Sequence, residues 1–397
     1  MDCAKQKASS ATGSKEIMDK VQTSGYNSSA AEPSREISSE QKFFYRQKSK
    51  QWIRAASETS DEFDGGRIST GDVSLSSKEL AGLTASANLD DGRWSIIPKF
   101  ESEEIILGRF LGNGAYGIVY EVVGFTNLAK IENQKSRLQI KRNHLNEEEE
   151  PKYALKKIRG KLSASQTNDA ITDLAIEARI LSCITHRNIV KIYATARGDP
   201  LSSKFFIIME RLRGTLEDRL VGWGARLTQT VGSCFCLGGS KNRVMGDIWS
   251  ERFGVASDLA SAIRYLHEHY IIYRDIKPEN MGFDVQGNLK LFDFGLAKPL
   301  HDEKKNELGL YKLTSNVGSR RYMAPEVALG KPYDMTLDVY SFAILFWQVC
   351  ALETPFSDLT ELDTHLKEVA KGGRRPVINK KWPRSWGVFL NKCWNGE

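Results

Sequence analysis

The sequence predicts an α+β fold with two lobes: a small, mostly antiparallel sheet that carries one main helix, and a larger helical lobe after it. Two observations lead to this prediction. Between residues 104 and 210, short runs rich in β-branched and aromatic residues recur between polar and turn-forming stretches, as strands do. After residue 212 the apolar residues take helical spacing, for example over 257–269 and 338–352.

The small lobe is expected to contain five strands and one helix. The strands are predicted at about 104–112, 117–124, 152–159, 190–196 and 204–210. Residues 167–182, between the third and fourth strands, have helical spacing and predict the main helix. The small lobe therefore spans about 104–211, and the large lobe about 212–397.

Two polar stretches lengthen connections in this plan. Residues 125–151 separate the second and third strands and end in the acidic run at 147–150. Residues 222–250 lengthen the connection before the helix at 257–269. Surface loops tolerate added residues at little cost, so both are interpreted as insertions that leave the fold unchanged. The first is expected to be mobile, and a partner site remains an alternative.

The composition indicates a folded protein with a disordered leader. The chain has 397 residues, 41% hydrophobic and 27% charged, enough for a substantial core. Residues 1–95 are rich in Ser and other small or polar residues, which predicts a disordered segment. The aromatic run at 43–45 within it is interpreted either as a docking segment or as scattered aromatics. A net charge of +6 without a dense basic stretch argues against nucleic acid as a partner.

The cysteines and apolar stretches bear on the compartment. The six cysteines lack the spacing of zinc ligands, so free thiols in a reducing compartment and no structural zinc are expected. The N-terminus has no apolar signal segment. The longest apolar stretch, 339–352, is shorter than the roughly 20 residues of a membrane span. We therefore predict a cytoplasmic protein without a membrane span, with the nucleus as an alternative location.

The strongest chemical signal lies in the large lobe. Residues 273–280 read Tyr-Arg-Asp-Ile-Lys-Pro-Glu-Asn, and Asp-Phe-Gly follows at 293–295. Asp275 can accept a hydroxyl proton, and Lys277 can neutralise charge on a transferred phosphoryl group. Asn280 and Asp293 offer hard oxygen ligands for Mg²⁺. This set, in this order and spacing, is what phosphoryl transfer from Mg²⁺–ATP to a hydroxyl requires.

At these residues the chain resembles the eukaryotic protein kinases, in their catalytic loop and magnesium loop. The resemblance implies a Gly-rich phosphate cover upstream, and 111–119 read Leu-Gly-Asn-Gly-Ala-Tyr-Gly-Ile-Val. A dinucleotide-binding fingerprint would open a helix, but a β-branched run follows Gly117. No Gly-Lys-Ser/Thr follows, which excludes a Walker-type loop. Taken alone, the pattern leaves a turn without a ligand as an alternative.

The resemblance also implies a lysine–glutamate pair. Lys156 in Tyr-Ala-Leu-Lys-Lys-Ile matches the phosphate-binding lysine, and Glu177 on the following helix matches its partner. Lys157 would face the other side of the strand. The catalytic set is then Asp275, Lys277, Lys156 and Glu177, with Asn280 and Asp293 as metal ligands.

The nucleotide contacts follow from the same resemblance. They are Leu111, Gly112, Asn113, Gly114, Gly117, Val119, Ala154, Lys156, Met209, Glu210 and Leu212. Val119 and Ala154 would form an apolar roof over the base, and residues 210–212 would bind its edge through their backbone. Gly282 stands where kinases place a bulky aliphatic residue. The floor of the base site is therefore expected to be roomier, or filled by a shifted neighbour.

The activity implied is that of a serine/threonine kinase, because Lys277 follows Asp275 in the serine/threonine form of the loop. Its cofactors would be ATP and Mg²⁺, and its partners protein substrates with Ser or Thr acceptors. In the family Glu326 pairs with an arginine shortly after a Cys-Trp pair like that at 393–394, and this chain stops first. A kinase domain over 104–397 with a truncated end is therefore predicted. Two alternatives are a pseudokinase scaffold, and an adaptor that binds docking partners through its leader or insertions.

Overall fold

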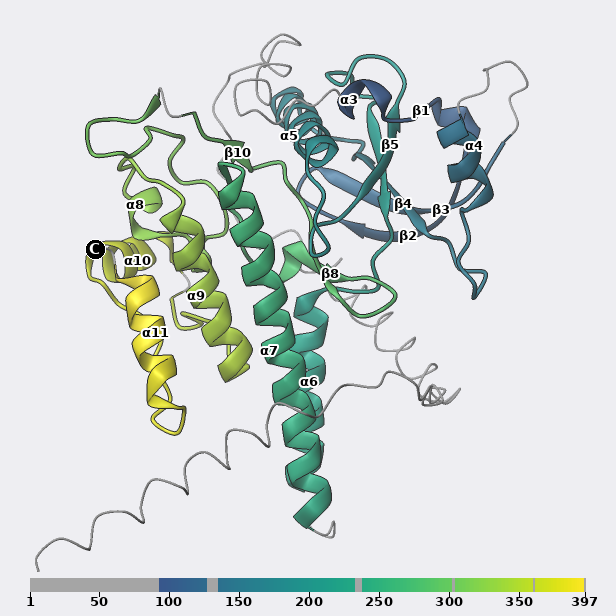
Figure 1. The fold of residues 1–397 in the computed structure, drawn as a ribbon. Coiled ribbons are helices and arrows are strands. Elements are labelled where there is room, and N and C mark those ends of the chain that lie inside the picture. The colour runs from purple at the N-terminus through teal and green to yellow at the C-terminus, as the bar shows by residue number, and fades with distance from the viewer. Residues whose placement is uncertain (1–92, 127–134, 233–237, 302–303, 360, 396–397) are drawn as a thin grey trace, which may run out of the picture. The chain divides into compact units, whose positions relative to one another are not determined.

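The computed structural model describes residues 93–126, 135–232, 238–301, 304–359 and 361–395. They belong to one compact unit, Gly65–Glu397. Apart from its last three residues, the predicted leader lies outside the described residues. Within them the two-lobed α+β fold is confirmed: a sheet with one long helix comes first, and a helical lobe follows (Figure 1).

The small lobe is built on a six-stranded sheet of order β1-β5-β6-β4-β3-β2. Its strands are β1 (Lys99–Phe100), β2 (Ile105–Asn113), β3 (Gly117–Phe125), β4 (Tyr153–Ile158), β5 (Ile192–Ala196) and β6 (Phe206–Glu210). All neighbours pair antiparallel except β1 and β5, which are parallel. Strands β2 to β6 confirm the five predicted strands to within about two residues at each end.

The main helix of the small lobe, α5 (Ala164–Cys183), begins three residues before its predicted start. Ser163 caps it, accepting from the backbone N–H of Gln166, whose side chain accepts in return from the N–H of Ser163. Such a capping box satisfies two of the N–H groups that a helix start leaves without partners. The cap fixes the first turn of the helix that carries Glu177.

A short segment before the predicted domain also joins the small lobe. Helix α3 (Arg93–Ile96) contacts α5, and β1 extends the sheet at its β5 edge. Trp94 receives two cations on its ring, Arg179 of α5 at 5.5 Å and Lys99 at 5.6 Å from the centroid. The sequence did not predict these elements, because two to four residues are too few to show a period.

The first insertion contains a helix, α4 (Lys135–Arg142), which lies at the β1 edge of the small lobe (Figure 1). Its Arg137 is buried and forms an ion pair with the buried Glu104. Ile140 of the same helix is buried in the core. This part of the insertion is therefore held against the sheet, where the sequence led us to expect a mobile stretch.

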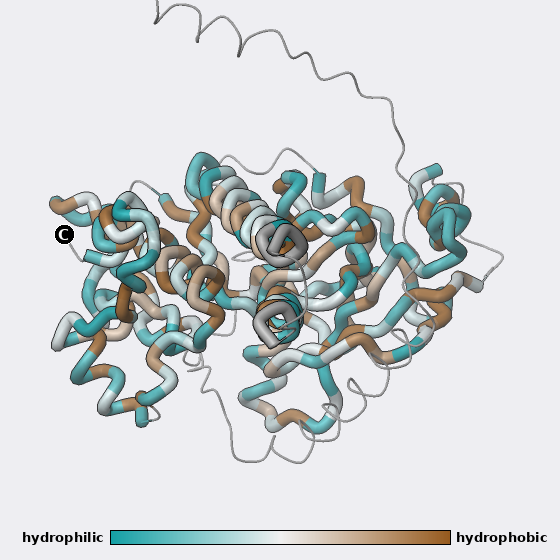
Figure 2. The backbone as a smooth tube through the Cα atoms, turned by 90° about the horizontal axis from the view of Figure 1, so that it is seen from below, coloured by the Kyte–Doolittle hydropathy of each residue, from teal (hydrophilic) through white to brown (hydrophobic). Residues whose placement is uncertain are grey.

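The described residues of the second insertion are helical, which the sequence analysis of 222–250 did not predict. Helices α6 (Leu216–Gly232) and α7 (Gly238–Glu268) extend into it and run side by side (Figure 1). Trp223 donates from Nε1 to Glu251 at 2.6 Å, and Arg226 forms an ion pair with the same carboxylate at 2.8 Å. Figure 2, which looks along these helices, shows that both carry hydrophilic as well as hydrophobic residues.

The rest of the large lobe surrounds α9 (Thr336–Ala351), which is buried over most of its length. The short elements that carry the catalytic segments are β7 (Ile271–Ile272), β8 (Met281–Phe283), β9 (Leu289–Leu291), β10 (Lys298–Pro299) and the 3₁₀ turns η2 (Pro278–Asn280) and η4 (Arg320–Tyr322). The outer helices are η1 (Ser102–Glu104) in the small lobe and, in the large lobe, α8 (Pro325–Ala328), α10 (Leu362–His365), the π-helix η5 (Leu366–Lys371) and α11 (Arg384–Trp394). Across the described ranges, no helix combines the length and apolarity needed to cross a membrane.

Candidate active site

Asp275 lies at the centre of a hydrogen-bonded catalytic loop. Its Oδ2 accepts from Lys277 Nζ at 3.0 Å and from Asn280 Nδ2 at 2.8 Å, and its Oδ1 accepts from the Ser319 hydroxyl at 2.9 Å. The carboxylate is buried but remains within reach of hydroxyl donors. Three of the predicted residues, Asp275, Lys277 and Asn280, are thus brought together as expected, and Ser319 joins them.

The loop is held from below by Asp338 of α9, which is fully buried. Its two carboxylate oxygens accept from the backbone N–H groups of Tyr273 and Arg274, both at 2.9 Å. Arg274 has φ +71° and Asp293 φ +62°, in the left-handed region that costs non-glycine residues roughly 1–3 kcal/mol. Such backbone strain persists only where the surroundings fix it, and here it lies at the residue before Asp275 and at the first residue of the Asp-Phe-Gly segment.

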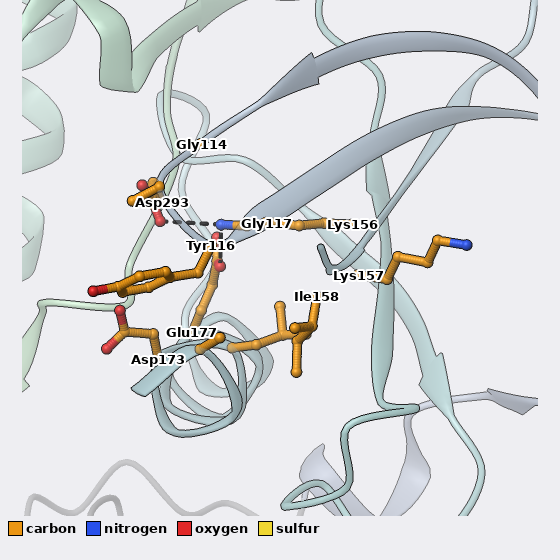
Figure 3. Close-up of a pocket in the computed structure, with 12 residues that line it drawn as sticks. Gly114, Tyr116, Gly117, Lys156, Lys157, Ile158, Asp173, Glu177 and Asp293 are labelled. Atoms are coloured by element: carbon orange, nitrogen blue, oxygen red, sulfur yellow. Dashed lines mark hydrogen bonds and ion pairs between the residues drawn. The ribbon is translucent and has the colours of Figure 1, made fainter. Parts of the chain in front are cut away.

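Lys156 on β4 links the two lobes. Its Nζ lies 2.5 Å from Oε2 of Glu177 on α5 and 3.0 Å from Oδ1 of Asp293 (Figure 3). Figure 3 also shows Lys157 pointing away from this group, as the alternation of a strand predicts. The predicted Lys156–Glu177 pair is therefore present in the structure, together with the aspartate of the Asp-Phe-Gly segment.

Burial would lower the pKa of Lys156, but the charges of Asp293 and Glu177 outweigh this and raise it. The ammonium is therefore held in its charged form. Burial raises the pKa of Glu177, and the negative charge of Asp293 adds to this rise, while the positive charge of Lys156 opposes it. Within the described residues, Glu177 Oε1 is buried without a hydrogen-bond partner. The group thus carries more negative than positive charge.

The Gly-rich segment forms the end of the β2–β3 hairpin. Leu111, Gly112 and Asn113 close β2, and the turn is fixed by a bond from Gly114 N–H to Gly117 C=O at 2.9 Å. A side chain at Gly117 would place its Cβ 3.1 Å from Cε of Lys156. A larger residue at Gly117 would therefore push the Lys156 stem by a few tenths of an ångström.

A pocket opens between this hairpin, α5 and Asp293 (Figure 3). Its lining includes residues 114–117, Lys156, Glu177 and Asp293, together with Asp173. The ring of Tyr116 lies between Asp293 and Asp173 in Figure 3. Asp173 and Tyr116 were not among the predicted site residues. Asp173 precedes Glu177 by four residues on one helix, so the shared face of a helix could have indicated it.

The base-site residues lie on neighbouring strands. Ala154 pairs with Met209 across β4 and β6, and Val119 pairs with Lys156 across β3 and β4. The N–H groups of Glu210 and Arg211 are used by Lys191 and Lys152 carbonyls, at 2.9 and 3.0 Å. Among the described residues, the N–H of Leu212 donates to no backbone acceptor, and it remains available to a ligand.

The donor set for a metal is limited to two side chains. Asn280 donates from Nδ2 to Asp275, so its side-chain oxygen Oδ1 is left as the ligand atom. Asp293 offers a carboxylate. The backbone joins them, since Phe292 N–H donates to Asn280 C=O at 3.0 Å. Two hard oxygens beside excess negative charge fit Mg²⁺, which binds through one or two protein ligands plus phosphates and water.

Glu326 of α8 is half-buried, and none of the described residues forms an ion pair with it. Burial raises the pKa of Glu326, and the positive charge of Arg375 opposes that rise only in part. Arg375 itself donates to the Trp394 and Val369 carbonyls.

Comparison with known proteins matches the protein kinase domain family over residues 141–393, more than half of the chain. The matched region begins after the Gly-rich hairpin. A stretch of 143 residues, 36% of the chain, is 39% identical to serine/threonine-protein kinase STY17 of Arabidopsis thaliana, of which it covers 24%. A probable serine/threonine-protein kinase of Dictyostelium discoideum is 27% identical over 74% of the chain and 26% of its own length. The dual specificity protein kinase shkB of Dictyostelium discoideum is 34% identical over 36% of the chain and 21% of its own length.

The chain therefore spans about a quarter of the length of the curated relatives it matches. The matched region contains the catalytic loop, the Asp-Phe-Gly segment and both members of the Lys156–Glu177 pair. The family model and the arrangement of these residues agree, and together they confirm that the chain belongs to the protein kinase domain family.

Proposed function

We propose that this chain is a serine/threonine protein kinase that transfers the γ-phosphoryl group of ATP to protein hydroxyls. The observation that carries the proposal is the pair of assembled charge groups, Asp275 with Lys277 and Asn280, and Lys156 with Glu177 and Asp293. They have the order and contacts that phosphoryl transfer requires. Protein substrates with Ser or Thr acceptors, a cytoplasmic location and a kinase domain over 104–397 belong to the same proposal.

In this proposal Asp275 accepts the proton of the substrate hydroxyl. Its Oδ1 already accepts from one hydroxyl, that of Ser319, which supports an approach by a second hydroxyl donor to the same carboxylate. Lys277 lies 3.0 Å from Oδ2 and places positive charge where the phosphoryl group would develop negative charge. Glu177 holds Lys156 toward the phosphates, and residues 112–117 cover them.

Asn280 and Asp293 would hold Mg²⁺, which supplies positive charge to the phosphate oxygens when bound. Val119 and Ala154 would contact one face of the base, and the backbone of residues 210–212 would bind its edge. We do not propose the pseudokinase alternative, because the sequence retains every residue that the resemblance assigns to catalysis. Docking partners for the leader and the insertions stay a prediction.

The experiment compares the chain with Asp275→Asn in transfer from labelled ATP to a basic test protein with Mg²⁺. We expect label on serine or threonine, and a loss of at least roughly 100-fold in the variant, because the base and its charge are removed. Label on tyrosine as well would indicate dual specificity. Equal labelling by both chains would contradict the role of Asp275. Binding of Mg²⁺–ATP without any transfer by the unmodified chain would favour a scaffold.

A further inference from the structure

Gly282 of β8 has no room for a side chain while Leu212 keeps its present position. A Cβ at this residue would lie 2.6 Å from Cδ1 of Leu212, 3.1 Å from its Cβ and 3.2 Å from the Gly214 carbonyl oxygen. Contacts below 3.0 Å do not occur between real Cβ atoms and carbon, so the space is already filled. Leu212, from the linker between the lobes, fills it. This settles the two expectations for Gly282 in favour of a shifted neighbour.

The backbone explains how Leu212 comes so close. The segment after the linker pairs with β8, through a bridge between Thr215 and Gly282 and a bond from Arg213 N–H to Phe283 C=O at 2.7 Å. A side chain at Gly282 would press mainly on Leu212 and less on the Gly214 carbonyl oxygen, so Leu212 could not keep its present position. The missing side chain therefore allows the linker to lie directly on the strand that follows Asn280.

The linker is held from its other side as well. Arg211 is buried and forms an ion pair with Glu121 of β3 at 2.8 Å, and Arg213 reaches Glu148 at 2.9 Å and Glu150 at 2.5 Å. The two arginines flank Leu212 in the sequence, so its backbone is anchored on both sides while its side chain lies against Gly282. A half-buried leucine with both neighbours anchored has little freedom to leave its place.

We propose that Leu212 supplies the apolar surface beneath the nucleotide base, in place of a side chain from β8. The proposal rests on the proposed function. Leu212 follows β6, whose Met209 pairs with Ala154, and it lies over the strand that follows the metal ligand Asn280. A planar base needs apolar contact on both faces, and Gly282 offers none. In this chain the second face would then depend on the linker and not on the large lobe.

The test exchanges the two residues. Leu212→Gly alone should weaken Mg²⁺–ATP binding by about 10-fold, the effect of losing part of one leucine contact. The exchange Leu212→Gly/Gly282→Leu should regain at least about a third of the lost affinity. Both variants carry the same flexible glycine at position 212, so any recovery comes from the side chain on β8. Titration calorimetry measures both, and thermal unfolding checks that each variant is folded.

A ligand without a base separates the possible outcomes. Mg²⁺–ribose 5-triphosphate should bind the unmodified chain and Leu212→Gly equally, because its contacts lie at Lys156 and the hairpin. An equal loss of both ligands in Leu212→Gly would overturn the proposal, since the residue would then support the linker only. Unchanged ATP binding in Leu212→Gly, or no recovery in the exchange, would also overturn it. If the unmodified chain binds neither ligand, the proposed function fails instead.

Discussion

Two glutamates of the small lobe are equally buried, yet their surroundings differ. The side chains of Glu104 and Glu177 are each 1% exposed, and each is paired with a cation. Glu104 receives two cations, Arg137 and Lys141, and accepts from the Glu101 N–H at 2.9 Å. Glu177 receives one, Lys156, which it shares with Asp293. Glu104 therefore has more positive than negative charge around it, whereas Glu177 and Asp293 share a single positive charge.

The pKa values of the two groups move in opposite directions. Burial alone would raise the pKa of Glu104, but its N–H bond and the charges of Arg137 and Lys141 lower it. Burial raises the pKa of Glu177, against the opposing charge of Lys156. Glu104, which anchors helix α4, thus finds all the positive charge it needs within the fold. The group in the cleft is left short of positive charge, which a bound metal ion would supply in the proposed function.

The largest expected effect comes from breaking the cleft pair. Lys156→Met should reduce phosphate transfer by at least roughly 100-fold, because a preorganised positive charge at the phosphates is lost. The matched control is Lys157→Met, its neighbour on the other face of β4, which loses only a contact with the Tyr120 ring at 5.3 Å. Initial rates with Mg²⁺–ATP measure both. If both variants lose transfer rate equally, Lys156 has no special role at the phosphates and the prediction is wrong.

The second effect concerns the anchoring pair and should appear in stability. Glu104→Gln leaves Arg137 buried without a full countercharge, which should lower the free energy of unfolding by about 3 kcal/mol. Urea unfolding measures this change. Once folded, the variant should retain most of its transfer rate, since the pair lies outside the cleft.

Glu103→Gln is the matched control, since Glu103 is the exposed neighbour of Glu104 on the same turn. It should unfold like the unmodified chain. A large loss of transfer rate in folded Glu104→Gln, with stability unchanged, would reverse the roles assigned to the two glutamates.

The ion pair of Glu177 could be predicted from the sequence, whereas that of Glu104 could not. Glu177 was predicted from the resemblance to the protein kinases, which carry the partner of Lys156 at this place on the following helix. Glu104 meets Arg137 across 33 residues, and no periodicity relates a 3₁₀ turn to a helix inside a polar insertion. Ion pairs of this kind depend on where the chain folds back, which composition and spacing do not specify.

Periodicity in the sequence also explains which helices and strands were predicted and which were not. Strands β2 to β6 and helix α5 are long and periodic, and their positions were predicted within a few residues. The segment from Arg93 to Phe100 and the extended α6–α7 pair were missed. In the α6–α7 region, residues 222–250 were interpreted only as an insertion, but contacts such as that of Trp223 with Glu251 stabilise helices there despite the low helix propensity of glycine.

The smallest expected effect is on the pH dependence of stability, to which Glu104 and Glu177 should contribute in opposite directions. Glu104 has a lowered pKa when folded, so its contribution to stability is present above about pH 4.5 and is lost as the pH falls through the folded pKa. Glu177 has a raised pKa when folded, so its contribution is present below about pH 4.5 and is lost as the pH rises through the folded pKa.

Urea unfolding of the unmodified chain, Glu104→Gln and Glu177→Gln between pH 3.5 and 7 measures both contributions. The stability gap to Glu104→Gln should widen as the pH rises from 3.5, because the charged carboxylate gains its two cations only in the folded state. The gap to Glu177→Gln should change in the opposite sense, because the folded cleft favours the protonated carboxyl. Two gaps that change in the same direction would mean that Lys156 compensates Glu177 fully, and that the cleft carries no charge deficit for a metal ion to fill.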